Sequence, residues 1–433
     1  MRYRFARVPF VGARKLLAMR LLFSFENQVP NSQADAEVFI NTASAVAKQN
    51  PNTTLTVPSL VDEAELRGRL QESFNISDEL EIVALKTARG SLGRQHLAHT
   101  AVLPQTQVFK NSDILYTRHL LLAMNAVRCG LPVVVDHYRP WGDQVPPFQL
   151  AIHKLMNHEL FLGLITHSVF AKKAYLRIGV PEEKIRVIYN GYDPLRLAAS
   201  TDQGEARAQL GLPPKKFIAV YTGRVNHKKG LDIVLDAAKR CPEVQFILVG
   251  SESQGPIEEA AANIENVKIV GWQPFEKTVP YLAAADVLLI PPSDIPLKKF
   301  GNTVLPLKTF LYLGAGRAIV GPATPDVEEI IEHDRNGLLV PPGNLEALIG
   351  ALKDLASSPE KKQRLSEAAQ SDGASLTWDA RASKILRFIE ERYDKPLVPR
   401  AEVFKYGRWL KESALWAQNL AVKRNWVTQT RGQ

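Results

Sequence analysis

Thirteen short apolar runs, alternating with helix-length amphipathic stretches, recur along almost the whole chain of 433 residues. This alternation is typical of βαβ units, in which a helix connects two parallel strands. The expected strands are residues 21–25, 55–57, 81–84, 114–116, 132–135, 163–166 and 186–189 in the first half, and 217–221, 245–249, 267–270, 287–290, 318–320 and 337–340 in the second. The sequence therefore predicts an α/β fold of two doubly wound, Rossmann-like domains.

The join between the two halves is rich in turn-forming residues. The segment NGYDP at 190–194 is followed by a polar stretch at 200–211, which places the boundary near residue 195. We expect a first domain over residues 1–195, a second over 196–394 and a basic helical tail over 395–433. Because ligands of open α/β sheets bind beyond the carboxyl ends of the strands, the cleft between the domains is the expected active site.

The net charge of +9 is concentrated at the two ends of the chain. Residues 1–20 contain six basic residues and no acidic one, and residues 395–433 contain eight basic residues against two acidic ones, with aromatic and aliphatic side chains among them. Such segments suit the surface of an anionic membrane, or they form a positive face that packs its apolar side onto the protein. Nucleic-acid binding is not expected, because no recognised nucleic-acid motif is present.

The two cysteines, Cys129 and Cys241, lie at the ends of apolar segments rather than at a metal-ligand spacing. Neither a disulfide framework nor a zinc site is expected, and a reducing cytoplasm fits best. No run of eighteen apolar residues occurs, so no spanning segment is predicted. Residues 1–18 are expected to be an extension upstream of a start at Met19 or an arm near a membrane.

Three loops of the second half carry glycines and cations at strand ends. Residues 221–232, YTGRVNHKKGLD, place Arg224 and Lys229 between a strand and a helix, where backbone N–H groups and cations favour a diphosphate. Solvated basic residues in a loop are the structural alternative. The run FILVG at 246–250 ends in Gly250, and FGNTV at 300–304 leads into the helix-forming LPLKTFLYLGAG at 305–316, where Lys308 adds charge.

Together these segments resemble the retaining glycosyltransferases of family 4, also described as glycosyl transferases group 1, which have the GT-B fold. The resemblance covers about residues 20–390 and rests on the order and spacing of several motifs. They are Gly223-Arg224 with Lys229-Gly230, VGW at 270–272, ADVLLIPPS at 285–293, LPLKTFLYLGAGRAIV at 305–320 and NGLLVPPGN at 336–344 in the second half, with 32–50, 114–138 and 166–193 in the first.

The resemblance assigns roles to particular residues. It implies that Arg224 and Lys229 hold the donor diphosphate and stabilise the leaving nucleotide in place of a metal ion. The backbone of Gly301, Asn302 and Thr303 would hold the donor sugar and its phosphate, and the base would lie near Gly271. The remaining residues of this expected donor site are Gly223, Gly250 and Lys308.

His137, at the end of the strand expected over 132–135, matches the histidine of the family that contacts donor or acceptor hydroxyls. A structural role for this lone histidine is the alternative.

Two features depart from the family pattern. Thr303 and Leu311 stand where the family has two glutamates eight positions apart, one near the sugar and one on the ribose. The usual glycine-rich loop after the first strand is replaced by residues 27–32, which contain no glycine. Other carboxylates that could compensate are Glu26, Asp136 and Asp294.

The sequence thus predicts retaining transfer of a hexose-type sugar from a nucleoside diphosphate sugar to a hydroxyl acceptor, with no bound metal and no cofactor. The first domain would bind the acceptor, which we expect to be lipid-linked or part of an envelope glycan. The expected location is the cytoplasm, with peripheral binding to the inner face of the membrane. One alternative is a degenerate relative that binds a nucleotide sugar or a partner without transfer, and another is a sugar-nucleotide epimerase.

Overall fold

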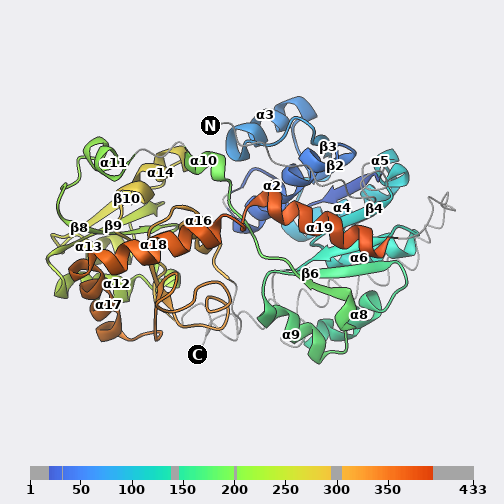
Figure 1. The fold of residues 1–433 in the computed structure, drawn as a ribbon. Helices are drawn as coiled ribbons and strands as arrows, with labels where there is room; N and C mark the ends of the chain where they lie inside the picture. Colours follow the sequence, from blue (N-terminus) through green and yellow to red (C-terminus); the bar gives the residue numbers. More distant parts are fainter. Residues whose placement is uncertain (1–18, 32, 138–145, 199–201, 294–304, 394–433) are drawn as a thin grey trace, which may run out of the picture. The chain divides into compact units, whose positions relative to one another are not determined.

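The computed structural model describes residues 19–31, 33–137, 146–198, 202–293 and 305–393, which divide into two compact units (Figure 1). The N-terminal unit contains the chain up to Thr166, Lys172–Ile188 and the segment that begins at Trp378. The C-terminal unit contains His167–Ala171 and Tyr189–Thr377. Residues 1–18 and the tail predicted over 395–433 lie outside the described residues.

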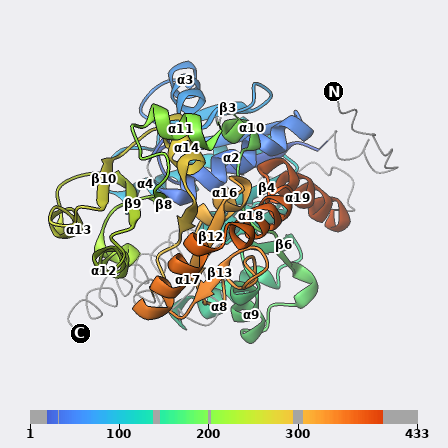
Figure 2. The same ribbon diagram turned by 60° about the vertical axis from the view of Figure 1, so that its left-hand side comes forward.

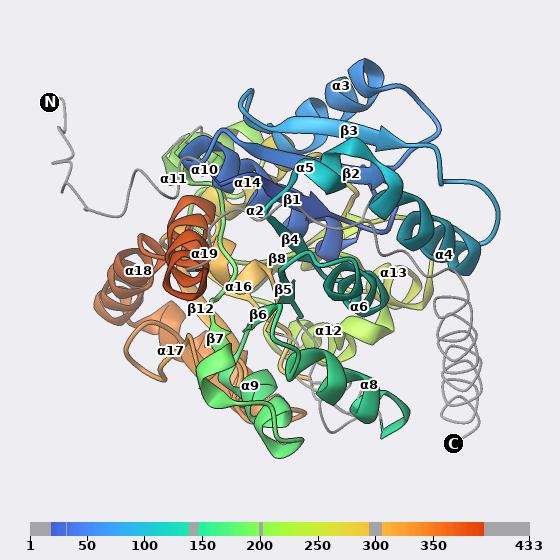
Figure 3. The same cartoon turned by 90° about the vertical axis from the view of Figure 1, so that its right-hand side faces the viewer.

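The N-terminal unit is built on a parallel sheet of seven strands in the order β3-β2-β1-β4-β5-β6-β7 (Figure 3). The strands are β1 (Leu21–Ser24), β2 (Thr53–Pro58), β3 (Glu81–Leu85), β4 (Ile114–Thr117), β5 (Val133–Asp136), β6 (Phe161–Thr166) and β7 (Ile185–Val187). The helices are α2 (Ala34–Gln49), α3 (Glu63–Phe74), α4 (Leu92–Val102), α5 (Gln107–Asn111), α6 (Leu120–Arg128), α8 (Pro146–Met156), α9 (Val169–Arg177, the first residues of which belong to the C-terminal unit) and α19 (Trp378–Arg392). The chain reverses its direction across the sheet between β3 and β4, which is the doubly wound topology.

Both faces of this sheet are buried, because alternate strand residues point to opposite sides. On one face, Leu22, Leu115 and Leu164 belong to a core that includes residues of α6 and α8. On the other face, the ring of Phe23 stacks on Tyr116 at 4.4 Å between centroids and meets Phe39 of α2 edge-on at 5.8 Å. Full burial of such side chains stabilises the fold by about 1.5–3 kcal/mol each.

The C-terminal helix α19 is tied to the N-terminal unit by a buried ion pair. Arg381 of α19 donates to Asp136 Oδ2 at 2.8 Å, and both side chains are almost completely buried. Tyr116 and Arg118 donate to the same carboxylate oxygen at 2.9 and 3.3 Å. Gly163 of β6 leaves room for the helix, since a Cβ there would lie 2.4 Å from the ring of Phe388. Figure 1 shows α19 beside α2, although they are far apart in the sequence.

The C-terminal unit has a parallel sheet of six strands in the order β10-β9-β8-β11-β12-β13 (Figure 2). The strands are β8 (Phe217–Thr222), β9 (Val244–Ser251), β10 (Val267–Gly271), β11 (Val287–Leu289), β12 (Ala318–Pro322) and β13 (Leu338–Val340). The helices are α10 (Pro194–Ala198), α11 (Gln203–Gln209), α12 (Asp232–Arg240), α13 (Pro256–Ala261), α14 (Phe275–Ala284), α16 (Lys308–Gly314), α17 (Leu345–Ser357) and α18 (Pro359–Gly373).

Alternation along the strands again divides the core into two layers. Ala219, Phe246 and Val287 face the layer formed with α12, α13 and α17, whereas Ile218 and Ile247 face the layer formed with α14, α16 and α18. The central strands β8, β11 and β12 are therefore apolar on both sides, which explains why each reads as a continuous apolar run in the sequence.

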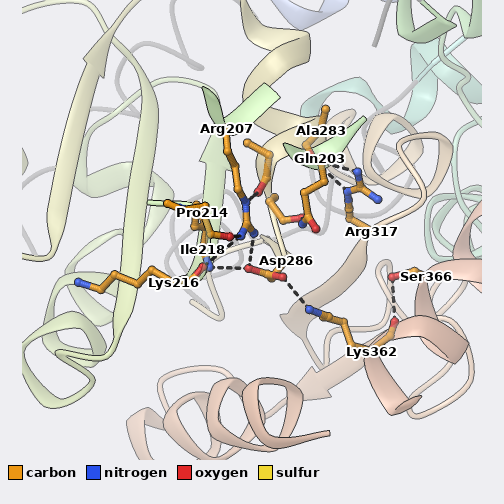
Figure 4. Close-up of polar contacts among 12 residues, drawn as sticks. Gln203, Arg207, Pro214, Lys216, Ile218, Ala283, Asp286, Arg317, Lys362 and Ser366 are labelled. Carbon is orange, nitrogen blue, oxygen red and sulfur yellow. Dashed lines mark hydrogen bonds and ion pairs between the residues drawn. The ribbon is translucent and has the colours of Figure 1, made fainter. Parts of the chain in front are cut away.

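A buried ionic cluster holds the amino-terminal edge of this second sheet (Figure 4). Asp286, which directly precedes β11, accepts from Arg207 of α11 at 2.6 Å and from the backbone N–H of Ile218 at 2.8 Å. Its second oxygen accepts from Lys362 of α18 at 2.6 Å. Because parallel strands all start at this edge, the cluster lies at the end of the sheet opposite to the loops that follow β8, β9 and β10.

The structure confirms the predicted α/β class and both doubly wound sheets. All thirteen expected strands are present, with bounds that agree to within two residues. In the described part of the chain, none of the helices has the length and apolar character needed to cross a membrane.

Candidate functional site

Three of the predicted glycines lie at the carboxyl edge of the second sheet, on adjacent strands. Gly223 follows β8, Gly250 lies near the end of β9, and Gly271 ends β10. Gly223 and Gly250 have φ angles of 129° and 116°, which favour glycine. A Cβ on Gly250 would lie 2.5 Å from the carbonyl oxygen of Gly223, so the two loops touch through their backbones. At Gly271 the nearest atom is 3.9 Å away, so packing does not require glycine there.

Tyr312 fixes helix α16 to the end of β8, and Tyr221 fixes the loop that follows β8. Tyr312 of α16 accepts from the backbone N–H of Thr222 at 2.8 Å, and Tyr221 donates from its hydroxyl to the carbonyl of Arg224 at 2.8 Å. Burial raises the pKa of Tyr312 to about 12, and it also raises that of Tyr221, so both phenols stay protonated. The loop that carries Gly223 and Arg224 is thereby held at the end of β8, next to α16.

Lys308, in that first turn, points toward the same loop. Its Nζ lies 3.6 Å from the centroid of the Tyr221 ring, and a Cβ on Gly223 would be 3.1 Å from this nitrogen. Burial, and secondly the charge of Lys229, hold the pKa of Lys308 well below its usual value. The structure therefore brings the predicted Lys308 next to the predicted Gly223.

Arg224 and Lys229 complete a group of three cations, here called the cation cluster, with Lys308. Lys229 ends a short 3-10 turn, His227–Lys229, which Gly230 closes at a φ of 70°. Partial burial, and secondly the charge of Arg224, lower the pKa of Lys229. Like charges gathered at a strand end are costly without a counter-anion, and such perturbed groups mark candidate functional sites.

Two polar side chains beside the cation cluster were not predicted. Glu252, in the loop after β9, lies 3.4 Å from Arg224 Nε, and the two side chains are 50% and 42% exposed. Asn226 has a buried Oδ1 without a hydrogen-bond partner among the described residues. The position of Glu252, two residues after Gly250 in a loop at the carboxyl edge, is the sequence signal that could have identified it.

His137 belongs to the N-terminal unit and follows β5. It is 4% exposed, its Nδ1 contacts the Tyr175 hydroxyl, and its backbone N–H donates to Ile165 at 2.9 Å. The ring is thus held in one orientation at the carboxyl edge of the first sheet, which is compatible with either of the two roles considered from the sequence.

The carboxylates considered as replacements for the missing glutamates differ in their surroundings. Asp136 is occupied by its buried ion pair with Arg381. Burial raises the pKa of Glu26, just beyond β1, to about 7, and its Oε2 has no hydrogen-bond partner among the described residues. Asp294 lies outside the described residues.

Three predicted donor-site residues, Gly301, Asn302 and Thr303, also lie outside the described residues. Leu311 is described: it is half-buried on α16 and packs against the core layer that contains Ile218 and Ile247. An aliphatic side chain therefore occupies this position one turn after Lys308. Within the described ranges, no group of three or more His, Cys, Asp or Glu is arranged as a metal site.

Comparisons with known proteins find similarity to glycosyltransferases. Residues 216–358 match the family model described as glycosyl transferases group 1. The chain is 25% identical over 212 residues to the D-inositol 3-phosphate glycosyltransferase of Mycobacteroides abscessus, with 47% of this chain and 45% of that protein covered. It is 27% identical over 190 residues to the lipopolysaccharide core biosynthesis glycosyltransferase LpsE of Rhizobium meliloti, with 43% and 52% covered. The chain therefore spans about half the length of these curated relatives.

Among solved structures, the chain is similar to Anabaena Alr3699/HepE in complex with UDP. The TM-score is 0.67 at 20% identity, and the likeness covers 86% of this chain and 100% of the other. This likeness establishes the GT-B fold class that the sequence predicted.

Proposed function

Because residues 216–358 match the family model described as glycosyl transferases group 1, we propose that the chain transfers a sugar from a nucleoside diphosphate sugar to a hydroxyl group. The observation that carries the proposal is the cation cluster of Arg224, Lys229 and Lys308 beside the close backbone contact of Gly223 and Gly250. Cations and exposed backbone at the carboxyl edge of a parallel sheet suit a diphosphate. The UDP complex of Alr3699/HepE supports this class of ligand.

In the proposed reaction the bond between the anomeric carbon and the diphosphate oxygen breaks, and the acceptor oxygen bonds to that carbon. The electron pair stays on the diphosphate, and the proton of the acceptor hydroxyl passes to the departing phosphate oxygen. We propose that the new bond forms with retention of configuration. The cation cluster would stabilise the charge that develops on the leaving diphosphate without a metal ion, as preorganised cations do in other sites.

The acceptor would bind to the N-terminal unit, where His137 would contact hydroxyls of the donor or acceptor. The LpsE relative, named for lipopolysaccharide core biosynthesis, supports an acceptor in an envelope or lipid-linked glycan. The basic ends of the chain support a cytoplasmic protein that binds peripherally to anionic membranes. Salt-sensitive co-sedimentation with vesicles that contain anionic lipid tests this part of the proposal.

Alanine substitution of Arg224 and Lys229 tests the function itself. We expect the double variant to lose sugar transfer by at least about 100-fold, in line with the removal of preorganised charge stabilisation, while its circular dichroism spectrum stays unchanged. Lys228→Ala is the matched control, because this exposed neighbour carries the same charge outside the cation cluster. Equal transfer rates for the double variant and the control would refute the assignment.

Leu311 favours a second candidate function, in which the chain binds a nucleotide sugar or a partner protein but transfers nothing. The position offers no hydrogen-bond acceptor, so a ligand hydroxyl placed there would stay unpaired. Transfer by the purified chain with any nucleotide sugar would exclude this alternative. A Leu311→Glu variant that gains transfer where the natural chain has none would support it.

A further inference from the structure

The loop after β9 places one acidic side chain beside the cation cluster. Glu252 follows directly on β9, and its carboxylate lies 3.4 Å from the Arg224 guanidinium. The backbone around it is fixed: the Ser251 hydroxyl lies 2.6 Å from the Glu258 carboxylate and 3.1 Å from the Ser253 carbonyl, and the Ser251 carbonyl accepts from the N–H of Trp272 at 2.7 Å. The backbone of Glu252 is therefore held at a defined position on the carboxyl edge, whereas its exposed side chain can turn.

The ion pair of Glu252 with Arg224 is weak and exchangeable. Both side chains are about half exposed, and exposed pairs of this kind contribute little to stability because water screens them. A diphosphate bound to Arg224 would repel the adjacent carboxylate. Glu252 would then turn away from the guanidinium while its backbone stays in place, which frees an ionised acceptor next to the ligand.

The order of the strands indicates which part of the ligand meets Glu252. The carboxyl ends of β8, β9 and β10 lie side by side, with the cation cluster at β8, Glu252 at β9 and Trp272 after β10. Trp272 is 61% exposed, and an exposed indole is a surface on which a nucleobase can stack. In a nucleoside diphosphate the ribose joins the diphosphate to the base. A ligand with its diphosphate at β8 and its base toward β10 therefore carries its ribose across β9.

We propose that Glu252 is a specificity residue that accepts hydrogen bonds from the 2′- and 3′-hydroxyls of the donor ribose. This inference rests on the proposed function, because it assumes a nucleoside diphosphate at the cation cluster. A carboxylate with two oxygens can accept from both hydroxyls at once, whereas Leu311 of α16 can accept from neither. The carboxylate at β9 thereby gives the site a preference for ribonucleotides over deoxyribonucleotides.

The test is calorimetric titration of the full chain with UDP, GDP and ADP and with their 2′,3′-dideoxy counterparts. We expect Glu252→Ala to weaken binding of the preferred ribonucleoside diphosphate by about 10- to 100-fold, the range for hydrogen bonds to a charged group. Binding of the dideoxy ligand should change by less than about threefold. Glu259→Ala, an exposed carboxylate of α13, is the matched control and should change neither constant.

Two results would overturn the inference without touching the proposed function. Tighter binding of both ligands to Glu252→Ala would mean that the carboxylate only competes with the diphosphate for Arg224. Equally weaker binding of the ribonucleoside and the dideoxy ligand would mean that Glu252 affects binding of the diphosphate or the structure of the loop, and not the ribose hydroxyls. If no nucleoside diphosphate binds the natural chain and Lys229→Ala changes nothing, the proposed function fails together with the inference.

Discussion

Replacement of Lys308 by methionine is predicted to stabilise the unliganded protein and to abolish a pH dependence of its stability. Burial and the charge of Lys229 hold the pKa of Lys308 well below its usual value, whereas in the unfolded chain it returns to about 10.4. Between these two pKa values the unfolded chain binds one proton more than the folded chain. The free energy of unfolding therefore rises with pH across this interval, by up to about 1.4 kcal/mol per pH unit.

Methionine fills a similar volume and does not titrate. The gain in the free energy of unfolding of Lys308→Met over the natural chain should therefore be largest at the acidic end of this interval. A change of 1 kcal/mol shifts the melting temperature of a unit of this size by about 2–4 °C. The variant should therefore melt above the natural protein at the acidic end of this interval, and the difference should shrink toward pH 10. The contact of Lys308 with the Tyr221 ring favours the charged form and offsets part of this gain.

Scanning calorimetry of both proteins at intervals between about pH 7 and pH 10 measures this difference. The comparison reports Lys308 together with its interaction with Lys229, because every other titrating group is shared. Lys228→Met is the control, since this exposed lysine should show no such trend. A melting-temperature difference between Lys308→Met and the natural chain that is constant with pH would refute the reasoning, as would a variant that melts lower throughout.

Three further predictions concern the loops, the ligand and the C-terminal helix. Gly250→Ala should lower the melting temperature and weaken nucleotide binding at least tenfold, because its Cβ would lie 2.5 Å from the Gly223 carbonyl; unchanged binding would contradict the close contact. A bound diphosphate should raise the pKa of Lys308, so calorimetric enthalpies of nucleotide binding should depend on the buffer more in the natural chain than in Lys308→Met. Arg381→Leu should lower the free energy of unfolding by about 3 kcal/mol, because Asp136 loses one of its partners. The denaturant midpoint of this variant should therefore be lower than that of the exposed control Lys384→Ala.

Much of the fold could be predicted because the strands are buried on both faces. Runs such as those ending at Gly250 and at Asp136 are continuously apolar, and turn-forming residues separate them from amphipathic helices. The predicted strand ends differ from the observed ones by one or two residues, because the last hydrogen bonds of a strand depend on the neighbouring strand. The sequence predicted Gly223 and Gly250 as loop glycines. It did not predict their direct contact, because that contact depends on β8 and β9 being neighbours in the sheet.

The details of the site depend on contacts between distant segments, which a sequence pattern does not contain. The position of Lys308 over Tyr221 requires α16 to pack against the end of β8, across 87 positions of the chain. The pairing of Glu252 with Arg224 requires β9 to lie next to β8. Arg381 reaches Asp136 from 245 positions away, and no local signal marks either residue as a partner of the other.

The most direct measurement of the central claim is a thermal-shift series with UDP, GDP, ADP and dTDP, each alone and as its common sugar conjugates. It compares the natural chain with Lys229→Ala, and Lys228→Ala serves as the control. A donor site at the cation cluster predicts that at least one nucleotide raises the melting temperature of the natural chain and of the control, and that Lys229→Ala loses this shift. No shift with any nucleotide, or an equal shift in Lys229→Ala, would contradict the account.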